Sequence, residues 1–226
     1  MESSHSKHAF SKAEREAVYR AIYERRDIRS EFLHQPIPEE ILMRILNAAH
    51  HAGSVGFMQP WNFIIINQHA IKCQVKELFI VENAKAAKNY TGDRLLKYQS
   101  FKLEGIEEAP INICVTCDPT RGGFVLGRNS IPETDLYSTC CAIQNMWLAA
   151  RAEGIGMGWV SIMDNRRLRD ILSIPNHVTP IAYLCLGYVS SFPEKPMLEQ
   201  KGWENRTPIE ELIFWNCWHN SLHAVQ

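Results

Sequence analysis

Four short, largely apolar runs constrain the fold of this chain more than any other feature. Each is shorter than a typical helix and is apolar on both of its faces, so each predicts a strand that is buried on both sides. The stretches between them repeat apolar residues at helical spacing. This alternation favours an α+β fold, layered around a central sheet, over a helical bundle. The runs are "WNFIII" at 61–66, "INICVTC" at 111–117, "GWVSIM" at 158–163 and "IAYLCLGYV" at 181–189.

Helical patterns surround these runs. The first helix begins at Ser11, which forms a capping box with Glu14, and is predicted to reach Arg25. The second follows "PIPEE" and ends before Gly53, and a short helix contains "RRLRDIL". Further helices are expected at about 69–89, 93–108 and 132–153. The last of these is apolar nearly all round, which predicts a central, buried position.

The overall charge limits the possible partners. With 24 Lys and Arg against 25 Asp and Glu, the net charge is −1, so nothing in the balance attracts nucleic acid or an anionic membrane. The start, "MESSHSKHAFSKAERE", lacks the apolar segment of a secretory signal, and no later stretch has about 18 uncharged apolar residues. We therefore expect a cytoplasmic protein without a membrane span.

A chain of 226 residues is long enough for one large domain without disulfides. No repeat, low-complexity tract or long linker divides it. We expect a single domain over 1–226, with a flexible N-terminus at 1–10 and a C-terminal arm at 190–226. The arm contains "IEELIFWNCW", which is too aromatic to remain in water. It packs either on its own domain or around a second subunit.

The seven cysteines and the paired histidines do not predict a metal centre. Cys114 and Cys117 form a C-x-x-C, but a spacing of three in a strand points the two side chains to opposite faces. No second pair completes a zinc site, so we expect no bound metal. His50 and His51 lie at a predicted helix end, where an imidazole complements the helix dipole.

The segment "ERRDIRSEF" at 24–32 places one carboxylate among three arginines. If the chain is extended there, Arg25, Asp27 and Arg29 share one side and Arg26 faces the other. Arginines at a helix C-terminus with an Asp among them can simply form surface pairs worth ~0–1 kcal/mol. Alternatively, the arginines hold an anion on which Asp27 acts. The segment alone favours neither interpretation.

The glycine-containing stretch "RGGFVLGR" at 121–128 is not a nucleotide motif. It lacks the GK[ST] ending of a phosphate loop and the strand-to-helix context of a dinucleotide fingerprint. We expect a mobile loop.

Three further stretches accompany the arginine cluster: "GSVGFMQPWNF" at 53–63, "GIGMGWVSI" at 154–162 and "KGWENRTPIEEL" at 201–212. Together the four resemble the FMN-binding pattern of the nitroreductase-like flavoprotein family, over about residues 11–215. The resemblance implies a nitroreductase-like three-layer sandwich with a central mixed sheet. It also implies a homodimer with FMN at the interface and the C-terminal arm extending onto the partner subunit.

Six motifs narrow the resemblance further: "RRDIR", "SVGFMQPWNF", "KLEGI", "ICVTCDPTRGG", "DLYSTCCAIQN" and "AARAEGIGMGWVSI". In this order they resemble one branch of the family most closely, the flavin-destroying synthases of 5,6-dimethylbenzimidazole. The resemblance implies that reduced FMN is the substrate and that molecular oxygen attacks it. The products would be 5,6-dimethylbenzimidazole, the lower ligand of vitamin B12, and D-erythrose 4-phosphate.

Two positions depart from the wider family. Phe57 stands where typical nitroreductases carry an Asn, which supports the branch. Asn205 stands where many members carry a Lys, which leaves the FMN phosphate with one cation fewer.

The resemblance also implies roles for individual residues. Asp27 and Ser161 match the branch's functional pair and would handle protons, although a Ser at 161 could instead satisfy a backbone group in the sheet. Arg25, Arg26 and Arg206 would hold the phosphate. The full set of expected FMN contacts is Arg25, Arg26, Asp27, Ile28, Arg29, Ser54, Met58, Gln59, Pro60, Leu103, Trp159, Val160, Ser161 and Arg206.

Leu103 is expected in a lid over the flavin ring, with an ordinary place in a helix core as the alternative. The expected partners are a second copy of the chain and a separate flavin reductase that supplies reduced FMN. Nucleic acid, membrane and metal are not expected. Two rival functions remain open: an NAD(P)H-dependent nitroreductase or reductive dehalogenase in which FMN survives, and a non-catalytic flavin carrier.

Overall fold

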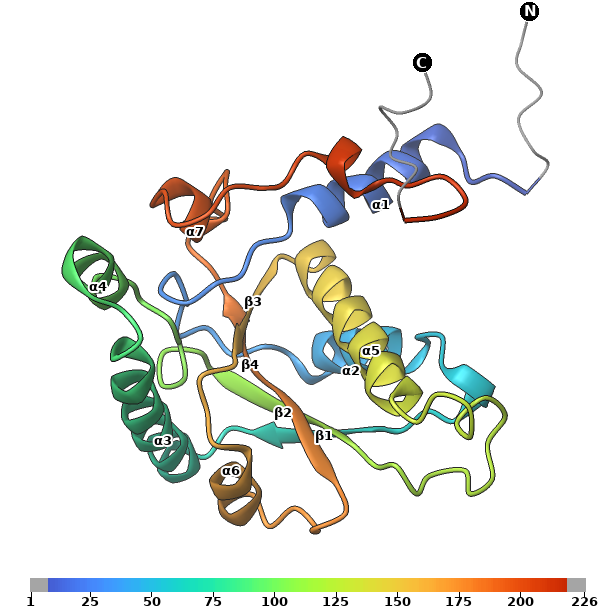
Figure 1. The fold of residues 1–226 in the computed structure, drawn as a ribbon, viewed down its shortest axis with the longest axis horizontal. Coiled ribbons are helices and arrows are strands. Elements are labelled where there is room, and N and C mark those ends of the chain that lie inside the picture. The colour runs from blue at the N-terminus through green and yellow to red at the C-terminus, as the bar shows by residue number, and fades with distance from the viewer. Residues whose placement is uncertain (1–7, 219–226) are drawn as a thin grey trace, which may run out of the picture. The chain divides into compact units, whose positions relative to one another are not determined.

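The computed structural model describes residues 8–218 (Figure 1). The chain divides into two units, Met1–Phe192 and Pro193–Gln226. The larger unit contains the sheet and the helices α1 to α6. The smaller contains α7 (Met197–Gln200), the 3₁₀ turn η2 (Ile209–Leu212) and a stacked aromatic pair, Phe214 and Trp218. Most of the expected flexible N-terminus lies outside the described residues. The single domain with an arm from residue 190 remains a prediction.

Four strands form one sheet in the order β1-β2-β4-β3. They are β1 (Trp61–Ile66), β2 (Ile111–Cys117), β3 (Ile155–Val160) and β4 (Thr179–Tyr188). All three neighbouring pairs run antiparallel, so the expected mixed sheet is wrong for these strands. Strands covered on both faces read as apolar runs whichever way they point, so the sequence pattern carried no information on direction.

The helices of the larger unit match most of the expected positions. The capping box of Ser11 and Glu14 is present at the start of α1. The exception is α4, which ends at Gln99 although a helix to residue 108 was expected. The helices are α1 (Lys12–Glu24), α2 (Glu39–His50), α3 (His69–Ala87), α4 (Gly92–Gln99), α5 (Thr134–Ala152) and α6 (Asn165–Ile171).

Buried contacts explain why α4 stops early. The Glu104 carboxylate lies inside the protein, where it accepts hydrogen bonds from Lys102 Nζ at 2.8 Å and from the Ile106 backbone N–H at 2.9 Å. A Cβ at Gly105 would lie 2.6 Å from a ring carbon of Phe32. The segment therefore folds inward against residues 29–32 rather than continuing as a helix.

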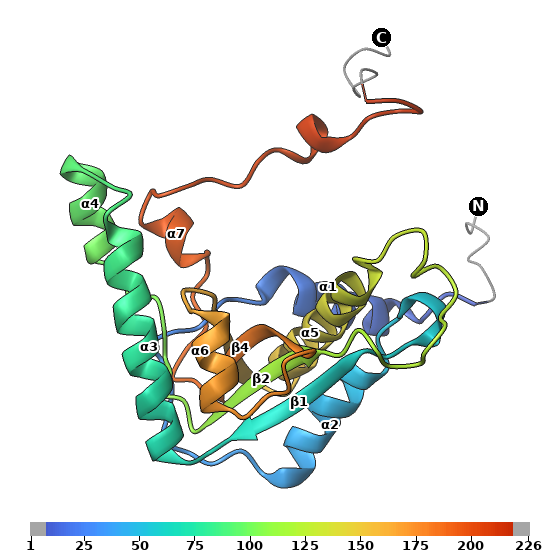
Figure 2. The same ribbon diagram turned by 60° about the horizontal axis from the view of Figure 1, so that its bottom comes forward.

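The sheet separates two hydrophobic cores, which gives the expected three layers (Figures 1 and 2). On one face α2 and α5 contribute Ile45 and Met146 to a core with the sheet. On the other face α3 and α6 contribute Leu78 and Leu168. Helix α5 is buried along one stripe and exposes others, such as Tyr137 and Cys140, so the expected all-round burial is only partly met. Helix α1 packs against it.

Candidate active site

The arginine-rich segment lies side by side with the middle of β3. Asp27 forms an isolated parallel bridge with Met157, and the Ile28 N–H donates to the Met157 carbonyl at 3.1 Å. The Trp159 backbone N–H donates to Asp27 Oδ1 at 3.0 Å. Ile28 is buried in the core beneath. Two stretches that are far apart in the sequence, 25–29 and 157–159, therefore form one rigid local structure.

Two glycines of β3 allow the arginine segment to approach this strand closely. A Cβ at Gly158 would lie 2.0 Å from the Ile28 carbonyl oxygen, which no side chain tolerates. A Cβ at Gly156 would lie 2.4 Å from a methyl carbon of Val189 and 3.1 Å from Ile28. Sequence reasoning did not assign these glycines a role. Their signal was present, because glycine inside a buried strand marks the close approach of another backbone.

The Asp27 carboxylate is the electrostatic centre of this structure. It pairs with the Arg29 guanidinium, and the two side chains are 29% and 17% exposed. Burial raises the pKa of the Asp27 carboxyl, while the charge of Arg29, the Trp159 N–H and the charge of Arg25 act to lower it. Arg29 Nε is buried and has no hydrogen-bond partner among residues 8–218.

Arg25 and Arg26 both contact one indole, that of Trp147. The Arg25 guanidinium lies 4.5 Å from the centre of the Trp147 ring, in a cation–π contact. The Trp147 Nε1–H donates to the Arg26 carbonyl at 3.3 Å. Arg26 itself donates to two backbone carbonyls, those of Tyr23 and Arg25, each at 2.7 Å. Trp147 on α5 thus fixes the backbone of the segment, a role that the sequence did not reveal because Trp147 also fits the core pattern.

Ser161 does not lie inside a strand. β3 ends at Val160, and Ser161 is the exposed residue that follows, so the strand expected at 158–163 is wrong in its position. The Met163 N–H donates to the Ser161 carbonyl at 3.1 Å, which turns the chain away from the sheet. A pocket of about 120 Å³ lies beside Ser161. It is smaller than the ~300 Å³ at which ligand pockets begin.

The turn that precedes β1 has a strained and well-fixed backbone. Gly56, Phe57 and Gln59 all have positive φ, at 58°, 54° and 47°. Ser54 Oγ accepts from the Gln59 N–H at 3.2 Å, and the Val55 N–H donates to Ser138 Oγ on α5 at 3.1 Å.

The side chains of this turn point in different directions. Met58 and Pro60 are buried, whereas Phe57 is 81% exposed. Arg121, from the glycine-containing loop, donates to the carbonyls of Gln59 and Trp61 at 3.2 and 3.0 Å. The loop expected to be mobile therefore contributes fixed contacts to the turn.

Helix α5 sets the distance between the two halves of the expected site. Ser138 holds the turn at 54–60, and Trp147 holds the segment at 25–29. Nine residues along an α-helix correspond to about 14 Å. Within one chain, the turn and the arginine segment are thus set well apart.

Leu103 lies in the loop that follows α4 and packs on the α3 side of the sheet. This loop adjoins the arginine segment, since a Cβ at Gly105 would lie 2.8 Å from the Arg29 carbonyl oxygen. The alternative of a place inside a helix is wrong, because α4 ends at Gln99. The role in a lid stays a prediction.

Arg206 belongs to the C-terminal unit, between α7 and η2. It is exposed and lines an open pocket of about 740 Å³ with Glu204, Thr207 and Ile209.

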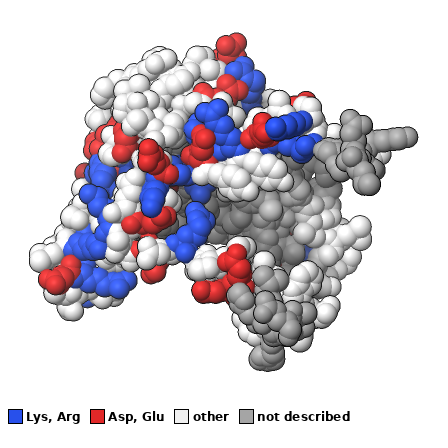
Figure 3. Space-filling view, turned by 90° about the horizontal axis from the view of Figure 1, so that it is seen from above, with Lys and Arg blue, Asp and Glu red and all other residues white. Residues whose placement is uncertain are grey.

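Charge on the face drawn in Figure 3 does not single out an anion site. Basic and acidic side chains are interspersed on the face drawn in Figure 3. An anion bound on this face must therefore rely on local groups, and the 25–29 segment offers three arginines in five residues. None of the helices described between residues 8 and 218 has the length and apolar character needed to cross a bilayer.

Comparisons with known proteins agree with this geometry. The sequence model of the Nitroreductase family matches residues 22–188. A 5,6-dimethylbenzimidazole synthase from Rhodospirillum rubrum is 40% identical over 185 residues, which covers 81% of this chain and 87% of that protein.

Two solved structures share the fold. An iodotyrosine deiodinase bound to FMN and 3-iodo-L-tyrosine has a TM-score of 0.70 at 20% identity, and covers 89% of this chain and 100% of its own. A BluB-like flavoprotein from Clostridium difficile 630 has a TM-score of 0.66 at 17% identity, and covers 88% of this chain and 98% of its own.

Proposed function

The chain belongs to the nitroreductase family, and we propose that within it the chain is a 5,6-dimethylbenzimidazole synthase that fragments reduced FMN with molecular oxygen. The observation that carries the proposal is the 40% identity, over most of both chains, to the Rhodospirillum rubrum synthase. The second product is D-erythrose 4-phosphate. We expect the reaction to take place in the cytoplasm.

The residues around Asp27 fit a flavin nucleotide, which carries an anionic phosphate and a ribityl chain of hydroxyl groups. Arg25, Arg26 and Arg29 offer positive charge, and the buried Arg29 Nε needs an acceptor that a ligand oxygen would supply. The Asp27 carboxylate, held by the Trp159 N–H, offers an acceptor for a ribityl hydroxyl. When bound, reduced FMN supplies the electrons that reduce oxygen and the ring that becomes the product.

The chain's own groups position that nucleotide and move protons. Arg25, Arg26 and Arg206 grip the phosphate, with no cation from Asn205. Asp27 takes a proton at the ribityl end, and its raised pKa brings it closer to the pH at which proton transfer works well in both directions. Ser161 donates a hydrogen bond near the ring.

Water is kept from the site by its covering segments. The loop that carries Leu103 covers the ring, and the turn at 54–60, with Ser54, Met58, Gln59 and Pro60, lies along its edge. Ile28, Trp159 and Val160 supply the wall behind the ribityl chain.

We infer a homodimer with two sites at the subunit interface. The turn and the arginine segment are about 14 Å apart along α5 within one chain, and the cleft beside Ser161 is too small for a flavin. Apolar side chains near the turn are also exposed, among them Phe57, Phe124 and Leu126. One site would combine the arginine segment of one subunit with the turn of the other.

A separate flavin reductase would supply reduced FMN, because the sequence contains no dinucleotide fingerprint. The rival within the family is an NAD(P)H-dependent reductase or dehalogenase that leaves FMN intact.

One experiment separates the possible functions. The purified protein is mixed with chemically reduced FMN, exposed to air, and the flavin products are separated by chromatography. A benzimidazole product supports the synthase. Intact FMN that cycles with NAD(P)H and an acceptor would replace the proposal with a reductase, and intact FMN that stays bound would replace it with a carrier.

A further inference from the structure

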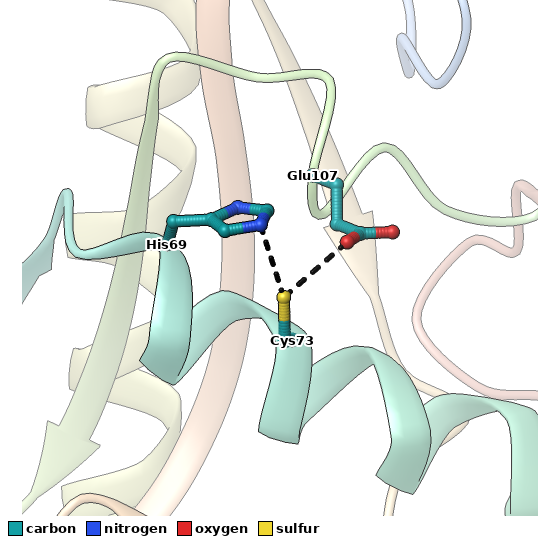
Figure 4. Close-up of side chains that lie close together, drawn as sticks. All are labelled: His69, Cys73 and Glu107. Atoms are coloured by element: carbon teal, nitrogen blue, oxygen red, sulfur yellow. Dashed lines mark hydrogen bonds between the residues drawn. The ribbon is translucent and has the colours of Figure 1, made fainter.

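Three potential metal ligands meet between α3 and the loop before β2, outside the candidate active site (Figure 4). His69 and Cys73 are one turn apart on α3, and Glu107 comes from the loop before β2. Cys73 Sγ lies 3.4 Å from His69 Nε2 and 3.5 Å from Glu107 Oε1. The three ligand atoms all lie within 4.8 Å of one another.

The two distances from Cys73 Sγ match edges of a tetrahedral zinc site. Zinc bonds of about 2.3 Å to sulfur and about 2.0–2.1 Å to nitrogen or oxygen, at tetrahedral angles, place sulfur about 3.5 Å from each of the other two ligands. The two measured distances agree with that value within about 0.1 Å. Two of the three edges therefore already have the length that a bound metal requires, and the third, between His69 and Glu107, is at most 4.8 Å.

The two ligand-bearing elements are already fastened together. Lys72, next to Cys73, is only 5% exposed, and its Nζ donates to the carbonyls of Ala109 and Pro110 at 2.6 and 2.9 Å. The Ala109 N–H donates to the Gly105 carbonyl at 3.0 Å. The loop of Glu107 is therefore already held against α3 by Lys72, the residue next to Cys73. Because the loop is held there, little entropy is lost when the Glu107 carboxylate binds a metal.

We propose that His69, Cys73 and Glu107 bind one divalent cation of the zinc type. Thiolate and imidazole select a borderline-soft metal over magnesium or calcium. On binding, the Cys73 S–H bond breaks, a metal–sulfur bond forms and the proton goes to solvent, while the metal keeps its charge of two. One thiolate and one carboxylate then neutralise the cation, and the exposed side of the cluster leaves the fourth position to water.

This site would replace the expectation of no metal, which was drawn from Cys114 and Cys117 and from the paired histidines. A metal bound there would cross-link the loop before β2 to α3. The same loop contacts the arginine segment through Gly105, so the metal would also lower the mobility of one side of the candidate active site.

The test is a cobalt titration of the full-length protein under reducing conditions, followed by zinc competition. Tetrahedral Co²⁺ bound to a thiolate gives strong visible d–d bands and a near-ultraviolet sulfur-to-metal charge-transfer band. We expect both bands to saturate at one equivalent of cobalt and to disappear on addition of one equivalent of zinc.

Variants assign the signal to its ligands. Cys73→Ser should abolish the charge-transfer band, and His69→Gln and Glu107→Gln should each weaken metal affinity at least about tenfold. Cys140→Ser is the matched control, since Cys140 is an exposed thiol of α5 outside the cluster, and it should bind as the wild type does. Circular dichroism verifies that each variant is folded.

Either of two results would overturn the proposal. The first is a wild-type protein that gives no tetrahedral cobalt spectrum at one equivalent. The second is a folded Cys73→Ser variant that keeps the charge-transfer band, which would assign the metal to another thiol.

Discussion

Asp27 carries the most specific chemical claim at the scale of single residues. Asp27→Asn keeps the shape and the acceptor for the Trp159 N–H but removes the group that takes a proton. We expect the variant to bind reduced FMN and to react with oxygen, yet to return oxidised FMN, with the yield of 5,6-dimethylbenzimidazole lowered by about 10²- to 10⁴-fold. Chromatography of the products measures this. A near-normal yield from the folded, flavin-bound variant would leave Asp27 as a mere counter-charge to its arginines.

The stability of the flavin-free protein should report the same carboxyl. Burial raises its pKa, so the folded protein holds the proton more tightly than the unfolded chain does. As the pH rises from the unfolded pKa of about 4 through the folded pKa, ionisation of Asp27 therefore lowers the free energy of unfolding. Asp27→Asn should be the more stable protein at neutral pH, and this advantage should vanish below about pH 4. Urea unfolding at a series of pH values tests it, and a more stable wild type at neutral pH would mean that the Arg29 pair outweighs burial.

Substitution of Gly158 tests the close approach of the arginine segment to β3. A Cβ there would lie 2.0 Å from the Ile28 carbonyl oxygen, so Gly158→Ala must displace residues 27–28. We expect it to lower the free energy of unfolding by about 1–3 kcal/mol, the range for overpacked sites, and to weaken FMN binding with it. Gly53→Ala is the matched control, because its Cβ would meet nothing within 4 Å. Equal stability of the two variants would contradict the close approach of residues 27–28 to β3.

At the scale of elements, the sequence predicted which segments form helices and strands better than where they end. The apolar runs of β1, β2 and β4 and the capping box of α1 were confirmed, because each depends on neighbouring residues. The ends of α4 and β3 differ from the predicted ends, because they depend on tertiary contacts. Glu104 is buried beside Lys102 and Lys76, and β3 stops pairing with β4 at Val160. Such partners are not visible in a local pattern.

The candidate site divides in the same way. The quoted motifs identified the stretches 25–29, 54–60 and 157–161 without showing how they meet. The close approach of residues 27–28 to β3 depends on Gly156 and Gly158, and glycines inside a buried strand do indicate such an approach. It also depends on Trp147, whose Nε1–H donates to the Arg26 carbonyl but whose position equally suits a core residue. The direction of each strand was not readable, because both faces of the sheet are covered.

Ser138 tests how α5 holds the turn before β1. Its hydroxyl accepts from the Val55 N–H and donates to the Thr134 carbonyl at 2.6 Å. Ser138→Ala leaves the Val55 N–H without its partner, which should cost about 1–3 kcal/mol and loosen the turn. We expect weaker FMN binding in a fluorescence titration. Ser100→Ala, at an exposed position, is the control and should change stability by at most ~0.5 kcal/mol. Unchanged affinity in Ser138→Ala would separate the turn from the flavin site.

At the scale of the whole molecule, the inferred homodimer predicts which lesions can complement one another. Light scattering should give a mass of about 52 kDa, twice the 26.0 kDa of the chain. Ser54→Asp keeps an acceptor for the Gln59 N–H but adds a negative charge beside the expected flavin, so it should strongly lower product formation, as is expected of Asp27→Asn. Each homodimer of a single variant then has two defective sites.

A mixed dimer of the two variants, isolated with two affinity tags, distinguishes shared sites from sites within one chain. If each site combines residues 25–29 of one subunit with the turn of the other, one site of the mixed dimer carries both lesions and the other carries neither. The mixed dimer should then form 5,6-dimethylbenzimidazole at about half the wild-type rate, because one of its two sites is intact. If each chain builds its own site, every site carries one lesion and the mixed dimer stays inactive. An inactive, flavin-binding mixed dimer would therefore mean that α5 brings the two halves together within a single subunit.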